Sequence, residues 1–248
     1  VHGRPVRRRA LRPGDEHLKR DPLAGKLPVT IITGFLGSGK TTLLKHLLTH
    51  PGMNRAAVVI NELGEVGIDH DLVQVSSEQM TLLSNGCLCC TVRTDLQETL
   101  RELFTQRRLG QVIDFDRVFI ETTGLADPAP VIQTIATDTL LADHFRLDCV
   151  ATLVDAVNGP AQLDTQPEAV KQAAVADRLL LTKTDLAAPA AVAALKERLR
   201  ALNPHALFVE VTNGEVDPAV LTDVGLRNSR PDAVRVQRWL GEVGDGSG

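Results

Sequence analysis

The stretch Gly34-Phe-Leu-Gly-Ser-Gly39-Lys40-Thr41 decides the fold, because it fits the pattern G-x-x-x-x-G-K-[ST] completely. An apolar run, Val29–Thr33, precedes it and predicts a strand, and the segment from Thr41 onward predicts a helix. Glycines allow backbone N–H groups to turn toward a phosphate, and a helix N-terminus adds partial positive charge. We therefore expect a phosphate-binding loop whose nucleotide contacts are Gly34, Gly37, Ser38, Gly39, Lys40, Thr41 and Thr42.

Two side chains of this loop carry the expected chemistry. Lys40 is predicted to reach the β- and γ-phosphates of a nucleoside triphosphate, and the Thr41 hydroxyl is predicted to ligate magnesium. A glycine-rich turn that resembles the motif by chance is the alternative. The strand and the helix predicted on its two sides both argue against that alternative.

Short apolar runs alternate with amphipathic segments downstream of this loop. The runs are rich in Val, Ile and Leu and predict strands at Val29–Ile32, Ala57–Ile60, Val118–Ile120, Val150–Val154, Leu179–Leu181 and Leu207–Val211. Helices are expected at Thr41–Thr49, Asp95–Arg107, Ala129–Thr139, Glu168–Ala176 and Ala190–Ala201. This alternation predicts an α/β fold, with a mostly parallel β-sheet and helices on both faces. Leu72–Leu83 could add another strand or a hairpin.

A second nucleotide element is expected in Arg117-Val-Phe-Ile-Glu121-Thr-Thr-Gly124, where an apolar strand ends in a carboxylate. A carboxylate at such a place can hold magnesium through a water molecule. We assign that role to Glu121. The backbone N–H of Gly124 is expected to contact the γ-phosphate and so to sense its presence.

The third element, Leu179-Leu-Leu-Thr182-Lys183-Thr184-Asp185, again places polar residues after a strand. It is similar to the guanine-reading N-K-x-D pattern, with Thr182 in place of Asn. Asp185 would accept hydrogen bonds from guanine N1–H and its 2-amino group, which adenine lacks. The Lys183 stem would cover the base. In the alternative interpretation, a helix starts here with Asp185 as its N-cap.

Asn85-Gly-Cys87-Leu-Cys89-Cys90 places three thiols within four residues. Clustered thiolates suit zinc or copper(I), and a disulfide between adjacent cysteines would be strained. A fourth ligand could come from Glu62, Glu65, His70 or a partner protein. The alternative is a set of inert cysteines in a turn. Cys149 lies in an apolar run, and we expect it in the core.

The overall composition restricts the class of protein. Only 3% of residues are aromatic and the net charge is -4, which disfavours nucleic-acid binding. No apolar run is long enough to span a membrane, and no signal peptide is evident, so we expect a cytoplasmic protein. Residues 1–26 resemble a flexible basic leader, 27–240 a nucleotide-binding domain, and 241–248 a disordered tail.

Together these motifs resemble the CobW-like family of P-loop GTPases, the zinc and cobalt chaperones related to the nickel-chaperone GTPases of hydrogenase and urease maturation. The resemblance covers about Pro28 to Leu221. It rests on T-G-F-L-G-S-G-K-T-T at 33–42, N-E-L-G-E-V-G-I-D at 61–69, N-G-C-L-C-C at 85–90, E-T-T-G-L-A-D-P at 121–128, V-D-A-V at 154–157 and L-T-K-T-D at 181–185.

The resemblance implies a SIMIBI-type P-loop GTPase that hydrolyses GTP to GDP with magnesium. It also implies that Cys87, Cys89 and Cys90 bind zinc (or cobalt) for a client metalloprotein, and that Glu65, in the switch segment 61–69, takes part in hydrolysis or metal binding. The smaller C-terminal domain of the family is not expected here. A metal-binding scaffold stabilised by nucleotide is the main competing hypothesis, and a P-loop kinase is a weaker one.

Overall fold

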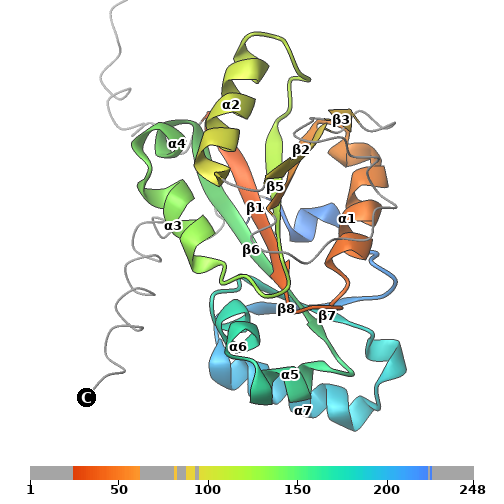
Figure 1. The fold of residues 1–248 in the computed structure, drawn as a ribbon. Coiled ribbons are helices and arrows are strands. Elements are labelled where there is room, and N and C mark those ends of the chain that lie inside the picture. The colour runs from red at the N-terminus through yellow and green to blue at the C-terminus, as the bar shows by residue number, and fades with distance from the viewer. Residues whose placement is uncertain (1–24, 62–80, 83–87, 93–94, 223, 225–248) are drawn as a thin grey trace, which may run out of the picture.

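The computed structural model describes residues 25–61, 81–82, 88–92, 95–222 and 224, and Figure 1 shows their arrangement. The strands are β1 (Leu27–Gly34), β2 (Ala56–Asn61), β3 (Thr81–Leu82), β4 (Leu88–Val92), β5 (Arg117–Thr122), β6 (Phe145–Asp155), β7 (Arg178–Thr182) and β8 (Leu207–Val211). The α-helices are α1 (Lys40–Thr49), α2 (Leu96–Arg108), α3 (Ala129–Thr137), α4 (Thr139–His144), α5 (Gly159–Thr165), α6 (Pro167–Ala174) and α7 (Pro189–Leu202). Short 3-10 turns are η2 (Pro51–Met53), η3 (Thr184–Leu186) and η4 (Pro218–Val220).

The strands form one sheet in the order β3-β4-β2-β5-β1-β6-β7-β8. All neighbouring pairs are parallel except β3 and β4, which pair antiparallel. The predicted α/β class is confirmed, and each of the six predicted strands is present.

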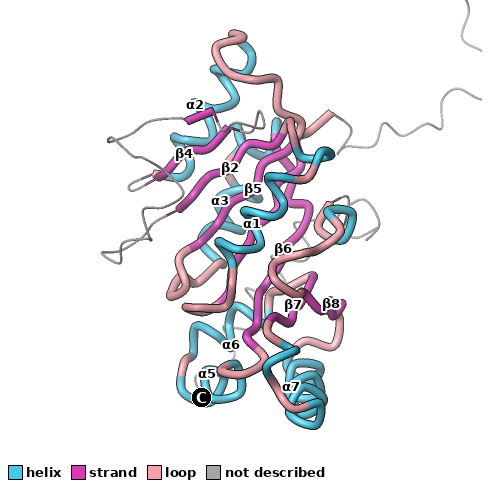
Figure 2. The backbone as a smooth tube through the Cα atoms, turned by 90° about the vertical axis from the view of Figure 1, so that its right-hand side faces the viewer, coloured by secondary structure: helices cyan, strands magenta, loops and turns pink. Residues whose placement is uncertain are grey.

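Helices cover both faces of the sheet. Alternate residues of each strand point to opposite faces, and apolar side chains on both faces are buried against helices. Val29 and Ile31 of β1 pack with buried residues of α2, α3 and α4, whereas Ile32 packs with Leu43 and Leu47 of α1. A third cluster joins α6 and α7 to β6 and β7. Figure 1 shows α5, α6 and α7 gathered at one end of the molecule, and Figure 2 shows α1 against the sheet.

The phosphate-binding motif lies where the strand order reverses. β1 stands between β5 and β6, with β2 to β5 on one side and β6 to β8 on the other. In open parallel sheets, ligands bind outside the carboxyl ends of the strands at such a switch point. Gly34, Thr122, Asp155 and Thr182 end β1, β5, β6 and β7, and they therefore lie at one edge of the sheet.

Three elements differ from the sequence-based expectations. β4 and α5 were not predicted. One continuous helix was expected at Ala129–Thr139, and this expectation is wrong: α3 ends at Thr137, and a separate helix, α4, begins at Thr139. Asp138 lies between them with an extended backbone, and its carboxylate accepts a hydrogen bond from Leu141 N at 2.8 Å. That capping bond starts a new helix where the pattern suggested continuation. Of the segment Leu72–Leu83, only β3 lies among the described residues.

Candidate nucleotide-binding site

The loop between β1 and α1 has the backbone conformation that its glycines permit. Gly37 and Gly39 have φ angles of 74° and 97°, in the region that favours glycine. A methyl group on Gly34 would lie 2.5 Å from Leu153 O of the neighbouring strand, so this position also excludes a side chain. The loop thus turns tightly at the carboxyl end of β1 and leads directly into α1, as the motif predicts.

Lys40 is folded back over this loop. Its Nζ donates to Gly34 O at 2.7 Å and to Phe35 O at 3.3 Å, and the residue is buried. Burial lowers the pKa of Lys40, while the negative charge of Glu121 acts in the opposite direction. A buried ammonium inside a glycine loop is suited to bind an anion, because an anion would compensate the charge that burial disfavours.

Thr41 and Glu121 lie together beside Lys40. Thr41 Oγ1 donates to Glu121 Oε1 at 3.3 Å, although the two residues come from α1 and β5. The next residue on β5, Thr122, donates to Thr33 Oγ1 at 2.8 Å and ties the ends of β1 and β5 together. A hydroxyl and a carboxylate oxygen held side by side fit the oxygen ligands that magnesium prefers.

The loop after β5 lies directly on the phosphate-binding loop at Gly124. A methyl group on Gly124 would lie 2.7 Å from the backbone nitrogen of Leu36, so only glycine allows this approach. The backbone of Gly124 therefore borders the loop that is predicted to hold the phosphates. Thr42 lies in the first turn of α1 and is exposed.

The predicted base-reading segment contacts the phosphate-binding loop through two side chains. Thr182 Oγ1 donates to Ser38 O at 2.9 Å, and Lys183 Nζ donates to Gly37 O at 2.9 Å. Asp185 is exposed within η3. Its alternative role as a helix N-cap is wrong, because the N-cap of η3 is Lys183 and that of α7 is Ala188.

Sequence reasoning gave no role to Asp155, although the V-D-A-V motif at 154–157 contains it. This residue supports the base-reading segment. Its buried carboxylate lies 2.6 Å from Lys183 Nζ and accepts backbone hydrogen bonds from Val157 and Asn158. Burial alone would raise the pKa of Asp155, but the hydrogen bonds from Lys183, Asn158 and Val157 outweigh it and hold the pKa below 3.8. An apolar strand that ends in a carboxylate, the signal used for Glu121, could have identified Asp155.

We predict that Asp155→Asn removes part of the dependence of the free energy of unfolding on pH in the acidic range. A carboxylate with a lowered folded-state pKa stabilises fully above its ordinary pKa of 3.8, and that stability is lost as the pH falls through the lower value. The variant should be less stable than the wild type by about 1.5–3 kcal/mol at pH 7, with the difference shrinking below pH ~4. Denaturant unfolding across this pH range measures it.

Asp164→Asn is the matched control, because Asp164 pairs with Arg198 at 2.8 Å but is 65% exposed. Exposed pairs contribute about 0–1 kcal/mol, so this change should have little effect at any pH. A difference between wild type and Asp155→Asn that is equal at pH 7 and pH 3 would contradict the role given to Asp155.

The predicted transition-metal ligands lie mainly outside the described residues. Cys87, Glu65, Glu62 and His70 are not described, and for Cys89 and Cys90 only the backbone in β4 is. β4 pairs with β2 through Val58↔Cys89 and Val59↔Cys90. Among the side chains that the structure describes, no group of three or more His, Cys, Asp or Glu forms a metal site. Cys149 is fully buried in β6, as expected.

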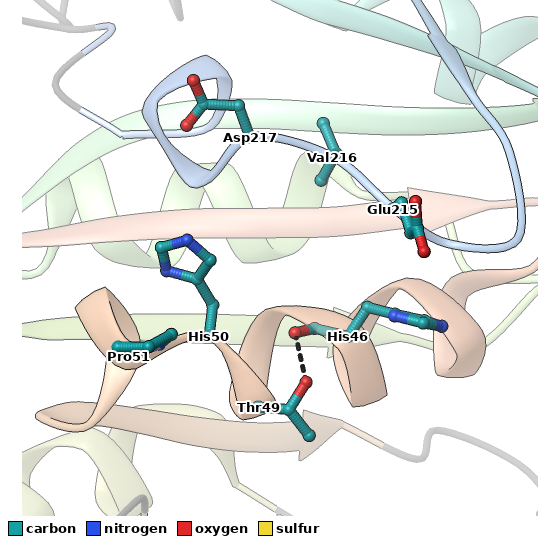
Figure 3. A pocket seen from close by; sticks show the side chains of 7 residues that line it. All are labelled: His46, Thr49, His50, Pro51, Glu215, Val216 and Asp217. Atoms are coloured by element: carbon teal, nitrogen blue, oxygen red, sulfur yellow. Dashed lines mark hydrogen bonds between the residues drawn. The ribbon is translucent and has the colours of Figure 1, made fainter.

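A groove of about 480 Å³ lies at the other end of α1, away from the phosphate-binding loop. Figure 3 shows His46 and His50 on one side and Glu215 and Asp217 on the other. His50 Nδ1 accepts a hydrogen bond from Gly52 N at 3.1 Å. None of the predicted site residues lines this groove.

Comparison with known proteins agrees with this geometry. The sequence model described as "CobW/HypB/UreG, nucleotide-binding domain" matches residues 28–210. The chain belongs to the CobW/HypB/UreG family. The family match includes the phosphate-binding loop, Glu121, Gly124 and the segment 182–185.

Several relatives within this family are named as zinc proteins. The zinc chaperone YjiA of Escherichia coli is 43% identical over 195 residues, which cover 79% of this chain and 60% of the relative. The zinc chaperone CobW of Pseudomonas aeruginosa is 35% identical and the zinc-regulated GTPase metalloprotein activator 1 of Schizosaccharomyces pombe 36% identical. Those matches cover 88% and 79% of this chain, and 64% and 48% of the relatives. The chain thus spans about half to two thirds of the length of these relatives.

Solved structures of family members share the fold. The Zn(II)-bound YjiA GTPase from E. coli superposes with a TM-score of 0.68 at 41% identity, over 81% of this chain and 62% of that one. HypB from Helicobacter pylori in complex with nickel has a TM-score of 0.51 at 19% identity, over 88% of this chain and 86% of that one. At this identity the similarity shows the fold alone. No helix in the described part of this CobW/HypB/UreG chain is long and apolar enough to cross a membrane.

Proposed function

We propose that this chain is the GTP-binding and GTP-hydrolysing part of a cytoplasmic metallochaperone that carries zinc to a client metalloprotein. The supporting observation is the way three strand ends converge on one loop. Lys40 bonds to the carbonyl of Gly34 and Thr41 to Glu121, while Thr182 and Lys183 bond to the loop's carbonyls. Relatives named zinc chaperones and a Zn(II)-bound YjiA GTPase support the choice of nucleotide and metal.

In this proposal each side chain has one task in hydrolysis. Lys40 and the N–H groups of residues 34–42 stabilise the negative charge on the β- and γ-phosphates while a water molecule attacks in line. Thr41 and Glu121 would hold magnesium, which neutralises phosphate charge, and Gly124 N–H would bind the γ-phosphate. Asp185 reads guanine, and the stem of Lys183 covers the base. Glu65, in the switch segment 61–69, takes part in hydrolysis or metal binding.

Zinc is the substrate of the carrier function, bound by Cys87, Cys89 and Cys90. The sheet supplies a connection from this segment to the nucleotide. Ile60 of β2 pairs with Thr91 of β4 on one side and with Glu121 of β5 on the other. The backbone next to Cys90 is thus two strands away from the proposed magnesium carboxylate, which supports coupling between zinc binding and the γ-phosphate state.

We predict that the GTP and GDP states differ at least tenfold in zinc affinity, about 1.4 kcal/mol of coupling. Ordering the switch segment around the γ-phosphate should change the ligands available to zinc. Calorimetric titration of zinc into the protein bound to GDP or to a non-hydrolysable GTP analogue measures the difference. By linkage, zinc should change the ratio of GTP to GDP affinity by the same factor.

Replacing Cys87, Cys89 and Cys90 by serine should abolish this shift and leave GTP binding intact. Cys149→Ala is the control, since Cys149 is a buried core residue and its loss should not affect zinc. Equal zinc affinity in the two nucleotide states, with no zinc-dependent phosphate release, would favour a metal-binding scaffold over a chaperone driven by hydrolysis.

A further inference from the structure

A buried side chain from a distant part of the chain holds the loop between β5 and α3. Gln172 of α6 donates through Nε2 to Gly124 O at 3.1 Å and to Ala126 O at 2.9 Å. The residue is 1% exposed. A single buried amide group therefore joins α6 to the loop that borders the phosphate-binding loop.

The position of Gln172 is fixed from the opposite side by the sheet. Thr152 of β6 donates through Oγ1 to Gln172 O at 2.7 Å, which seats α6 on that strand. Ala169 and Ala173 are buried on the same helix, and such small side chains allow α6 to lie close to the sheet. Gln172 thus reaches the loop from a rigid support.

The amide orientation is determined by its contacts. Both neighbours are carbonyl oxygens, so the NH₂ group must face them, and exchanging the amide atoms would place oxygen against oxygen. Gln172 Oε1 is buried and has no hydrogen-bond partner among the residues that the structure describes. Leaving a buried acceptor unsatisfied costs free energy. We infer that the two hydrogen bonds from Nε2 to the loop offset this cost and are the main contribution of this side chain.

Gly124 needs such external support. It has no side chain, and its backbone lies against Leu36 of the phosphate-binding loop. The bond from Gln172 to Gly124 O limits rotation of the peptide that follows Gly124, and the bond to Ala126 O fixes the loop two residues further on. The adjacent ion pair between Lys171 and Asp127, at 3.1 Å, is more exposed and gives weaker restraint.

We propose that Gln172 is a positioning residue for γ-phosphate recognition: it holds the Gly124 backbone in place and so sets the preference for GTP over GDP. This inference rests on the proposed GTPase function. In this proposal Gln172 acts through the carbonyls of Gly124 and Ala126 and not by direct contact with the nucleotide. Binding of GDP, which has no γ-phosphate, should not depend on it.

The test compares Gln172→Met with the wild type. Methionine preserves the length and burial of the side chain but has no N–H group to donate. Affinities for fluorescent GDP and for a non-hydrolysable GTP analogue should diverge, with GDP affinity within about twofold and analogue affinity about tenfold weaker. The hydrolysis rate at saturating GTP should also fall about tenfold, because the Gly124 N–H is no longer aligned.

Asn203→Ala is the matched control for a merely structural effect. Asn203 is also a buried amide, and its Nδ2 donates to Ala173 O, Ala174 O and Ala176 O at the carboxyl end of α6, without contacting the Gly124 loop. This variant should lower the melting temperature and keep the ratio of GTP to GDP affinity. An unchanged ratio in Gln172→Met, with a lower melting temperature like that of Asn203→Ala, would overturn the proposal.

A second measurement needs no destabilised variant. In the wild type, hydrogen exchange of the Gln172 side-chain amide should be slower in the complex with the GTP analogue than with GDP; equal rates would overturn the proposal.

The proposed GTPase function and the proposed role of Gln172 would be contradicted by different results. A wild type that neither prefers GTP to ATP nor hydrolyses it contradicts the GTPase function, and the inference falls with it. An active wild type whose Gln172→Met variant keeps its nucleotide ratio contradicts only the role of Gln172.

Discussion

Lys40→Ala should reduce GTP hydrolysis by about 10²–10³-fold while the protein remains folded. Lys40 supplies the side-chain charge that meets the phosphates, and removing one preorganised donor of this kind costs about 3–4 kcal/mol of transition-state stabilisation. Folding should survive, because burial already lowers the pKa of this ammonium and its removal relieves an unfavourable buried charge. Phosphate release under saturating GTP measures the rate, and thermal unfolding reports the fold.

Lys45→Ala provides the control for that experiment. Lys45 lies on the same helix, α1, but is exposed. Its replacement should leave hydrolysis within about twofold of the wild type, as expected for a surface change remote from the phosphates. Turnover by purified Lys40→Ala at the wild-type rate would refute the assignment of the loop as a catalytic phosphate site.

Asp185→Asn should exchange the nucleotide preference of the protein. The wild-type carboxylate is expected to accept two hydrogen bonds from guanine, and charged hydrogen bonds contribute about 1.5–3 kcal/mol each. We therefore expect GTP affinity to fall at least about 10²-fold, and xanthosine triphosphate to bind better, because its base presents an acceptor where guanine has a donor. Competition binding with GTP, ATP and xanthosine triphosphate measures the change.

The exposure of Asp185 makes this substitution easy to interpret, because an exposed carboxylate at η3 contributes little to packing. The exposed Asp164→Asn variant again serves as the control and should bind all three nucleotides like the wild type. If the wild-type protein binds ATP and GTP equally, Asp185 does not read the base.

The sequence was sufficient to predict the elements whose determinants are local. The phosphate-binding loop could be placed because its glycines, its preceding strand and its following helix are contiguous. Glu121 and Gly124 were predicted because they follow an apolar strand after a complete loop motif. In the structure, Thr41 and Glu121 lie within 3.3 Å of each other, so the two separate predictions meet at one place.

Other features depend on contacts between distant residues and were missed for that reason. Asp155 acquires its role from Lys183, which directly follows β7 and is brought to it by the parallel pairing of β6 with β7. Gln172 has no local signal at all, since its partners are backbone carbonyls on another loop. β4 was missed because its five residues include two cysteines, and the sequence reading weighed those as metal ligands or turn residues.

The pairing of β4 with β2 also determines how insertions between β2 and β3 would affect the sheet. The ladder from Ala57↔Leu88 to Asn61↔Val92 fixes the register of β4 against β2, whatever the number of residues between Asn61 and the start of β3 at Thr81. Doubling the length of a connecting segment costs only about 0.6 kcal/mol of closure entropy. A change in the length of this connection should therefore cost little stability, while the backbone at Cys89 and Cys90 keeps its register relative to Glu121.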